Sequence, residues 1–577
     1  MFGSAGVRSS AQEIHTRSQI GYAPWSGVCT GPHVPRLNKI AVSLAGTTLA
    51  VITASRIVTS APGTDVVTYH NDNARTGQNL SETILTLASV NSSSFGKRAF
   101  FPVDGKVDAQ PLFVSALSIP GLGAHDVLYA ATEHDSVYAL DAATGGVLWR
   151  TSALGVGETT SDTRGCSQVT PEIGITSTPV IDRSRGPHGA IYVVAMSRAG
   201  STYFQRLHAL DLATGAELFG GPTTIQASFP GSGAGSSGGS VVFDPKQYEE
   251  RAALTMLNGR IILAWTSHCD IDPYTGWIMA YDANTLAQSS VLNITPNGSR
   301  GGFWMAGAGP AVDPQGNIYL LDGNGTFDTT LTGAGFPSQG NFGNAFLKIA
   351  ASSGLAVADY FATFDTVAAT NADRDLGSGG TLVLPDFLDV TGQTRHLAVG
   401  AGKDGHIYVV NRDAMGKWNA LSNQSYQDIS GALGGSVFSM PAYFNNTVYY
   451  GAAGSTLKAF PITSARLASS AASASARSFA YPGTTPGVSA AGNANGIVWA
   501  VENSNPAVLH AYDARDLTRE LYNSNQAAAG RDQFGAGNKF ITPTIVNGQV
   551  FVGTPSGVAV FGIIAAPPAP TGLRIIS

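Results

Sequence analysis

The stretch Tyr138-Ala-Leu-Asp141-Ala-Ala-Thr-Gly145 occurs in four versions along this chain of 577 residues. The other three are His208-Ala-Leu-Asp211-Leu-Ala-Thr-Gly215, Met279-Ala-Tyr-Asp282-Ala-Asn-Thr285 and His510-Ala-Tyr-Asp513-Ala-Arg-Asp516. Each begins as an apolar alternating run, which is typical of a half-buried strand. The aspartate then favours a turn, and a glycine, where one follows, supplies the positive φ that ends it. A second strand follows, so the stretch predicts a repeated β-hairpin.

A second pattern precedes these hairpins. A proline opens a short apolar strand in Thr178-Pro-Val-Ile-Asp182, Gly309-Pro-Ala-Val-Asp313 and Thr542-Pro-Thr-Ile-Val546, and another strand follows each of them. Proline is tolerated at a strand start. Two strands and a hairpin make four antiparallel strands, which is one blade of a β-propeller. We therefore predict an all-β, eight-bladed β-propeller with units near 108–150, 173–220, 240–288, 307–362, 379–419, 436–481, 487–523 and 540–562.

The last predicted unit lacks its fourth strand, because its apolar pattern stops at Gly562. The segment from Phe95 to Phe101 is a spare strand ahead of the first unit. We expect this segment to complete the last blade, so that the two ends of the propeller pair in one sheet. Such closure removes exposed sheet edges, which invite aggregation.

The regions outside the propeller (62–562) have patterns of their own. Residues 1–61 form a leader in which Arg36-Leu-Asn-Lys39 precedes the apolar run 40–54, as in a signal peptide at about 36–61. A transmembrane anchor is the alternative, although the run is shorter than the roughly 20 residues that a span needs. We predict a secreted, periplasmic or cell-surface protein without a transmembrane span after signal cleavage. Residues 563–577 form a Pro-rich linker that resembles the opening of a fibronectin type III domain.

Composition and cysteine content limit the classes of partner and the cellular compartments that we expect for this protein. The net charge is −6 and 12% of residues are charged, so there is no basic footprint for nucleic acid. Two of the three cysteines, Cys166 and Cys269, lie beyond the leader. In an oxidising compartment such a pair predicts a disulfide bond. The alternative is two separate buried thiols.

The repeat resembles the PQQ repeat, the blade unit of quinoprotein dehydrogenases and of related non-catalytic propellers such as the outer-membrane assembly factors. The resemblance covers roughly residues 65–562, and the segment from Tyr69 to Gly77 is similar to the opening of secreted PQQ-repeat proteins. In the enzymes, pyrroloquinoline quinone (PQQ) lies in the central funnel against a Ca²⁺ ion. The resemblance implies a Glu, an Asn and an Asp as metal ligands and an Asp as base, because Ca²⁺ takes oxygen ligands and a carboxylate can accept the substrate proton.

The resemblance implies a role for several residues. Asn324 matches the metal-binding Asn, Asp375 matches the catalytic Asp that also faces the metal, and Lys403 matches the Lys that bonds the quinone oxygens. No Glu stands in the stretch expected to hold the metal-binding Glu, so Asp270 or Asp272 is the candidate there. The family's adjacent cysteine pair is also absent. Trp265 and Trp304 are candidates for stacking below the quinone. The alternative for Asn324, Asp375 and Lys403 is that they are ordinary turn residues.

Two further acidic groups stand near predicted strand ends. Glu172 precedes the first strand of the second unit, and we predict it at the mouth of the funnel without assigning it a role. Inner-strand mouths line ligand sites in propellers. Glu133-His134-Asp135 lies between two strands of the first unit, and we predict a solvent-facing hairpin turn.

Three functions are compatible with these patterns. The first is an exported binding or scaffolding module in the cell envelope or outside the cell, whose partner is a polysaccharide, a protein or a small-molecule ligand. The second is a PQQ- and Ca²⁺-dependent quinoprotein-like oxidoreductase acting on alcohols or sugars. The third is a polysaccharide lyase or hydrolase, for which the sequence contains no motif. The repeat predicts the fold strongly and the function weakly, because one fold carries many activities.

Overall fold

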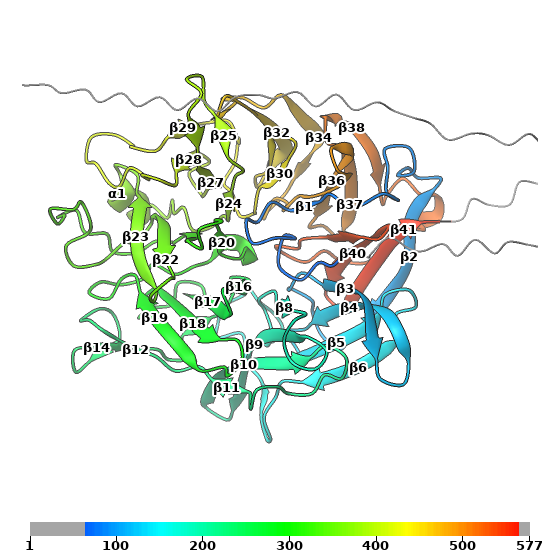
Figure 1. Ribbon diagram of the computed structural model, residues 1–577, viewed down its shortest axis with the longest axis horizontal. Helices are drawn as coiled ribbons and strands as arrows, with labels where there is room; N and C mark the ends of the chain where they lie inside the picture. Colours follow the sequence, from blue (N-terminus) through cyan, green and yellow to red (C-terminus); the bar gives the residue numbers. More distant parts are fainter. Residues whose placement is uncertain (1–63, 565–577) are drawn as a thin grey trace, which may run out of the picture. The chain divides into compact units, whose positions relative to one another are not determined.

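The computed structural model describes residues 64–564 of the chain. The predicted leader and signal peptide (1–61) lie outside this range, as does the predicted linker except for its first two residues. Within residues 64–564, eight sheets of four or five strands follow one another around a centre, as Figure 1 shows. This confirms the predicted all-β, eight-bladed propeller. No helix in the described part of the chain is long and apolar enough to cross a membrane.

The first four blades occupy the stretch from Leu112 to Phe361. Their strands are β3 (Leu112–Ile119), β4 (Gly123–Ala131), β5 (Ser136–Asp141) and β6 (Val147–Ser152); β8 (Val180–Asp182), β9 (Ala190–Ala199), β10 (Thr202–Asp211) and β11 (Thr223–Thr224), with β7 (Thr159–Thr160) beside β9; β16 (Thr255–Leu257), β17 (Arg260–Ser267), β18 (Trp277–Asp282) and β19 (Gln288–Asn293), with β15 (Tyr248–Glu249) beside β17; and β20 (Ala311–Val312), β21 (Ile318–Leu321), β22 (Phe346–Ala350) and β23 (Ala356–Phe361).

The other four blades complete the ring. Their strands are β24 (Thr381–Val383), β27 (Leu397–Ala401), β28 (Ile407–Asn411) and β29 (Gln427–Ile429); β30 (Ala442–Phe444), β31 (Thr447–Gly451), β32 (Ser455–Thr463) and β34 (Ser473–Phe479), with β33 (Arg466–Leu467) beside β32; β35 (Gly487–Ala491), β36 (Ala494–Glu502), β37 (Val508–Asp513) and β38 (Asp516–Asn523), with β1 (Gln78–Asn79) beside β35; and β39 (Thr544–Val546), β40 (Gln549–Thr554), β41 (Gly557–Ile563) and β2 (Phe95–Pro102).

The N-terminal strand β2 closes the ring. It pairs antiparallel with β41, with Phe95 opposite Ile563 and Phe101 opposite Val558. The expected pairing of the two ends of the propeller is therefore present, and the eighth blade has its four strands.

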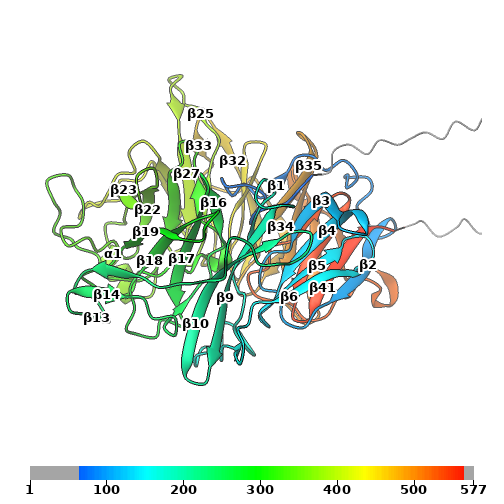
Figure 2. The same ribbon diagram turned by 60° about the horizontal axis from the view of Figure 1, so that its bottom comes forward.

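The third predicted unit begins later than expected. The sequence pattern placed its start near residue 240, but its innermost strand β16 begins at Thr255. Residues 240–242 instead form β14 (Ser240–Val242), which pairs with β12 (Ser228–Pro230) and β13 (Ser236–Ser237) in a small separate sheet. The short apolar run was misassigned because an apolar run of three residues carries no period that identifies its sheet. A two-stranded hairpin, β25 (Phe387–Leu388) with β26 (Thr394–Arg395), is inserted in the fifth blade; Figure 2 shows it projecting from the ring.

The repeated stretch forms the third strand of a blade and the turn after it. In the first copy, Asp141 Oδ1 accepts hydrogen bonds from the backbone N–H (2.8 Å) and the hydroxyl (2.7 Å) of Thr144. Gly145 follows with φ 75°, and a Cβ there would lie 2.3 Å from the Phe101 ring. The turn therefore needs a glycine both for its backbone conformation and for its contact with β2.

The turn also joins neighbouring blades. A buried tyrosine on the second strand of one blade donates its hydroxyl to the carbonyl that follows the repeated aspartate in the next blade. The pairs are Tyr129 with Leu212 (2.8 Å), Tyr192 with Ala283 (2.7 Å) and Tyr449 with Ala514 (2.7 Å). Since a buried hydroxyl and a buried carbonyl both need partners, this bond favours one register between neighbouring blades.

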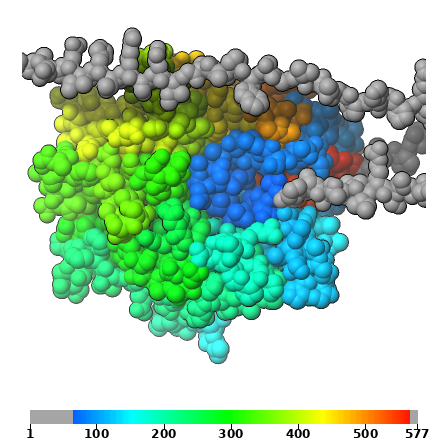
Figure 3. Space-filling view, in the orientation of Figure 1, coloured from blue at the N-terminus to red at the C-terminus, as the bar shows by residue number. Residues whose placement is uncertain are grey.

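The N-terminal segment, residues 65–79, touches the innermost strand of every blade in chain order. Its contacts are Val66 with Phe113, Val67 with Ile181, Asn73 with Met256 and with Val312, Ala74 with Val383, Thr76 with Tyr443, Gln78 with Val488, and Asn79 with Ile545. Figure 3 shows the N-terminal residues (blue) over the centre of one face of the ring. The segment therefore covers one end of the space between the blades.

Candidate functional site

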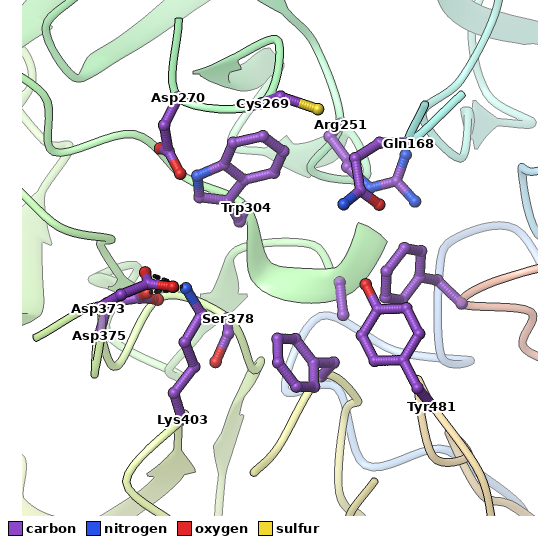
Figure 4. Close-up of a pocket in the computed structure, with 13 residues that line it drawn as sticks. Gln168, Arg251, Cys269, Asp270, Trp304, Asp373, Asp375, Ser378, Lys403 and Tyr481 are labelled. Atoms are coloured by element: carbon purple, nitrogen blue, oxygen red, sulfur yellow. Dashed lines mark hydrogen bonds and ion pairs between the residues drawn. The ribbon is translucent and has the colours of Figure 1, made fainter. Parts of the chain in front are cut away.

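A pocket lies where the loops at the inner ends of the blades meet. Its volume is about 270 Å³. The lining side chains come from seven of the eight blades or the loops leading to them, and Figure 4 shows their arrangement. They are Gln168, Arg251, Cys269, Asp270, Trp304, Ala306, Asp373, Asp375, Ser378, Lys403, Phe438, Tyr481 and Phe540. A pocket lined from so many blades is central to the ring.

One end of the pocket holds a lysine between two carboxylates. Lys403 Nζ lies 2.7 Å from Asp375 Oδ2 and 2.5 Å from Asp373 Oδ1. Asn324 donates from Nδ2 to Asp373 Oδ1 (2.7 Å) and to Asp375 Oδ2 (3.2 Å). The structure thus brings together the three residues that the resemblance singled out, Asn324, Asp375 and Lys403.

Local backbone contacts explain this arrangement. Lys403 N donates to Asp375 O (2.8 Å), so the turn after β27 lies against the loop that leads to β24. Gly402 permits the approach, because a Cβ there would lie 2.3 Å from Asp375 O. Asn344 Oδ1 accepts from Leu376 N (2.8 Å) and fixes the same loop from the fourth blade.

Burial and neighbouring charges together set the protonation states of Asp375 and Lys403. Asp375 is 2% exposed, and burial raises its pKa to about 6, although the nearby Lys403 ammonium acts in the opposite direction. Burial by itself lowers the pKa of Lys403, but the carboxylates of Asp375 and Asp373 outweigh it and leave that pKa raised. At neutral pH the pair is therefore a carboxylate and an ammonium.

Asn324 Oδ1 and Asp375 Oδ1 are two buried oxygen atoms beside this pair, and neither has a hydrogen-bond partner among residues 64–564. A calcium ion prefers carboxylate and amide oxygens as ligands, so these atoms suit it. Asp270 also lines the pocket, and its Oδ1 accepts a 2.5 Å hydrogen bond from Tyr274. Within residues 64–564 no three acidic, histidine or cysteine side chains are grouped closely enough to hold a metal. A Ca²⁺ ion here would need Asn324 and oxygens of a bound ligand in addition to the carboxylates.

The pocket wall contains strained backbone. Five lining residues other than glycine have positive φ: Cys269 (50°), Asp270 (53°), Ala306 (53°), Asp373 (54°) and Phe540 (62°). Each such residue costs on the order of 1 kcal/mol or more and persists where the surrounding structure holds it. Concentration of such residues at one pocket is typical of a functional site.

A disulfide bond joins Cys166 to Cys269 at the edge of the pocket. Cys166 lies in the loop between β7 and β8 of the second blade, and Cys269 follows β17 of the third blade. Their neighbours Gln168 and Asp270 both line the pocket. The bond therefore links two loops that shape one wall.

The opposite end of the pocket is aromatic and cationic. The rings of Phe438 and Tyr481 are 5.1 Å apart, and those of Tyr481 and Phe540 are 6.3 Å apart, both edge to face. The guanidinium of Arg251 lies 4.5 Å from the centre of the Phe540 ring. Trp304 lies between the two ends in Figure 4.

The remaining candidates lie elsewhere. Glu172 is not among the residues that line the pocket; it contacts His134 Nδ1 (2.9 Å) and Thr160 Oγ1 (2.6 Å). Asp272 forms an ion pair with Arg300 (2.6 Å). Trp265 is buried and donates to Gln205 Oε1 (2.7 Å), which leaves Trp304 as the tryptophan that faces the pocket.

We predicted that the turn Glu133-His134-Asp135 faces solvent, and this prediction was wrong for Glu133 and Asp135. Glu133 and Asp135 are fully buried. Glu133 Oε2 accepts from Gly174 N (2.9 Å) and from Thr176 Oγ1 (3.0 Å). The turn faces the loop of the second blade rather than solvent, and its pattern of polar residues does not distinguish these two surroundings.

Several lining residues were missed by sequence reasoning: Gln168, Arg251, Ser378, Phe438, Tyr481 and Phe540. They lie in loops, outside the strands that repeat from blade to blade. The loops differ from blade to blade, so no period in the sequence marks these positions.

Comparison with known proteins gives a family and several similar folds. A sequence profile described as "Glucose/ethanol/alcohol dehydrogenase, beta-propeller domain", of the PQQ type, matches residues 105–417. No curated protein sequence matches the chain. The quinohemoprotein alcohol dehydrogenase ADHIIG of Pseudomonas putida HK5 is similar in structure, with a TM-score of 0.56 at 15% identity over 89% of this chain and 82% of that chain.

Two further structures are similar at comparable levels. The quinohemoprotein alcohol dehydrogenase of Comamonas testosteroni has a TM-score of 0.54 at 15% identity, covering 90% of this chain and 84% of that chain. A europium-containing methanol dehydrogenase has a TM-score of 0.52 at 13% identity, covering 87% and 98%. At these identities the likeness establishes the fold.

Proposed function

Because the chain belongs to the PQQ β-propeller family of glucose, ethanol and alcohol dehydrogenases, we propose that it is a quinone-dependent dehydrogenase. Its substrate would be the hydroxyl group of an alcohol or a sugar. The observation that carries this proposal is the contact of Asp375 with Lys403 and Asn324 in the central pocket. A buried carboxylate with a raised pKa in a pocket is a candidate general base.

The residues present suit the cofactor and metal that this family implies. Asn324 Oδ1 and Asp375 Oδ1, buried oxygens without a hydrogen-bond partner in the described part of the chain, would hold Ca²⁺, with Asp270 in the same pocket as a further carboxylate. Lys403 would donate to the oxygens of the quinone, and Trp304 would pack against its ring. Bound PQQ would supply the acceptor for the two electrons that leave the substrate.

The chain's own groups then account for substrate activation. Asp375 accepts the hydroxyl proton, and its pKa of about 6 keeps it deprotonated at neutral pH while leaving it basic enough to take a proton. Lys403 holds the carboxylate in place through the 2.7 Å ion pair. Asn324 orients the same carboxylate from the other side.

This proposal is favoured over a binding or scaffolding module. A module that only holds a partner has no need for a buried ion pair flanked by unpaired acceptors, because such groups cost folding free energy. The third candidate, a lyase or hydrolase, has no motif in its support. We also propose that the protein is exported, since the disulfide between Cys166 and Cys269 suits an oxidising compartment.

Reconstitution tests the proposed activity. Purified protein is mixed with PQQ and Ca²⁺, and reduction of an artificial dye is followed with a panel of alcohols and sugars. We expect turnover with at least one substrate, a loss of at least about 100-fold in Asp375→Asn, and wild-type rates in Asp413→Asn, whose carboxylate pairs with His396 on the outside of the fifth blade. Folded protein that binds no PQQ, or an Asp375→Asn variant with full activity, would exclude the proposal.

A further inference from the structure

A second cavity lies in the cleft between the sixth and the seventh blade. Its volume is about 390 Å³, within the range of about 300–1,000 Å³ that is usual for ligand pockets. The lining side chains come from β34 of the sixth blade, from β36, β37 and β38 of the seventh, and from the turn after β38. Because β34 and β38 lie on the outer side of their blades (Figure 1), the cleft is separate from the central pocket and shares none of its lining residues.

His510 is a buried histidine that lines this cleft between two carboxylates. Its Nδ1 lies 2.7 Å from Glu520 Oε1, and its Nε2 lies 3.5 Å from Glu502 Oε2. The second contact is long for a hydrogen bond, and Nε2 has no hydrogen-bond partner among residues 64–564. A buried polar atom without a partner costs free energy, so Nε2 suits a polar group that enters the cleft.

The charges around His510 cancel. Arg477 donates to both oxygens of Glu502, from Nε (2.9 Å) and from Nη2 (2.5 Å). Burial by itself lowers the pKa of His510, but Glu502 and Glu520 outweigh it and leave that pKa raised, which favours the imidazolium. Two cations then face two carboxylates. This balance gives no net attraction to a charged ligand, so we expect an uncharged occupant.

Further polar groups at the cleft are free to bind a ligand. In the described part of the chain, neither Nη1 of Arg477 nor the side-chain amide of Asn525 makes a hydrogen bond, and both residues line the cavity. The amide offers N–H donors and a carbonyl acceptor. Val508 and Ala476 add apolar surface. A ligand that matches these groups carries several hydroxyls, which both donate and accept, on a small carbon frame.

We propose that the cleft between the sixth and the seventh blade is a binding site for an uncharged saccharide. One sugar hydroxyl would accept a hydrogen bond from His510 Nε2, and others would bind Arg477 and Asn525. The carbon face of the sugar ring would pack against Val508. The site needs no cofactor in the central pocket, so it does not rest on the proposed dehydrogenase activity.

The test uses the full chain without added cofactor, with glucose, galactose and mannose as probes. Calorimetry should show saturable binding of at least one of these sugars, and weaker binding of the corresponding uronate, which carries a negative charge. His510→Phe should lose at least about 10-fold in affinity, because the variant lacks a charged hydrogen-bond donor. Asn525→Ala should lose at least about 3-fold.

His208→Phe is the matched control. His208 begins the second copy of the repeated stretch, as His510 begins the fourth, and it pairs with Glu217 of the second blade. Within residues 64–564 it has no second ion pair that would correspond to the one with Glu502. His208→Phe should therefore bind the sugar as the wild type does.

Failure of all three sugars to bind the folded wild type would overturn the proposal, as would equal affinities in the wild type and in a folded His510→Phe variant. If His510→Phe does not fold, Asn525→Ala and Arg477→Gln replace it, and unchanged affinity in both would equally overturn the site. Sugar binding that is lost in Asp375→Asn but kept in His510→Phe would place the sugar in the central pocket and exclude the second site.

Discussion

Lys403 Nζ lies 2.7 Å from Asp375 Oδ2, and this contact joins the turn after β27 to the loop that leads to β24. Both groups are largely withdrawn from water, so their interaction is weakly screened. The ammonium opposes the effect of burial on Asp375, and the result is a carboxyl group that titrates at about pH 6. The pH dependence of any activity that uses Asp375 should therefore report on Lys403.

We expect kcat/KM of the PQQ- and Ca²⁺-loaded protein to rise with pH as Asp375 loses its proton, with a midpoint below the pKa of about 6 that Asp375 has without the ion, because a bound Ca²⁺ favours the carboxylate. Lys403→Gln should move the midpoint upward, because the ammonium lowers the pKa of Asp375. Asp373→Asn should move it downward, because the charge of Asp373 raises that pKa. Midpoints that move in the same direction in both variants would contradict this assignment of the base.

Two adjacent acids, Glu249 and Glu250, should respond oppositely to pH. Burial raises the pKa of Glu250 well above the usual range. Although burial acts in the same direction on Glu249, His268 and Arg251 leave the pKa of Glu249 lowered. Glu250 contributes stability that is fully present below its unfolded-state pKa and is lost as the pH rises through its folded-state pKa. Glu249 contributes stability that is present above its unfolded-state pKa and is lost as the pH falls through its folded-state pKa.

Thermal melts at several pH values measure this difference. Glu250→Gln should gain in Tm relative to the wild type as pH increases from 5 to 8. Glu249→Gln should have a Tm below the wild type at pH 8, with the gap narrowing as the pH falls below about 4.5. Two variants with parallel pH profiles would show that these carboxyl groups do not differ as described.

The disulfide between Cys166 and Cys269 spans 103 residues of sequence. Closing a loop of this length stabilises a folded protein by about 2–4 kcal/mol in typical cases. We expect the double variant Cys166→Ser, Cys269→Ser to lose stability of this size in denaturant titrations, and reductant to have the same effect on the wild type. Identical unfolding with and without reductant would mean that the bond contributes nothing to stability.

Arg75 should be a major source of stability, although it is not among the residues that line the pocket. It is fully buried, and it donates to Pro310 O (3.0 Å) in the fourth blade and to Tyr69 O (2.7 Å) and Thr68 Oγ1 (2.8 Å) within the N-terminal segment. Arg75→Ala should cost at least about 3 kcal/mol, because each acceptor left unpaired costs about 1–3 kcal/mol.

The exposed Arg98 provides the control for this variant. Arg98→Ala should change the free energy of unfolding by no more than about 0.5 kcal/mol. Equal effects of the two substitutions in urea titrations would show that the N-terminal segment does not hold the blades together.

The fold could be predicted because the sequence pattern of one blade is repeated along the chain. Each copy of the strand–Asp–turn stretch carries the same alternation and the same turn chemistry, and β2 was recognisable as the strand that the last unit lacked. The start of the third blade was not predictable, because residues 240–242 have strand character without a longer pattern. A tertiary contact, rather than local sequence, assigns them to another sheet.

The site was predictable where a local motif carries it. Asn324 follows β21, Lys403 follows β27 and Asp375 lies in the loop before β24. Each stands in a short motif with glycine, and the ring brings the three together. Arg251 and Tyr481 were not predictable, because they lie in loops of unique sequence whose meeting depends on the closure of the ring. Their chemistry becomes visible only when burial and neighbours are known.

Titration of PQQ in the presence of Ca²⁺ into the purified wild-type protein, followed by calorimetry, tests the central claim most directly. We expect saturable binding of one PQQ per chain that weakens at least about 10-fold in Lys403→Gln, while Lys246→Gln on the surface of the ring leaves it unchanged. Absence of binding to a folded protein with its disulfide intact would contradict the claim that this pocket is a quinone site.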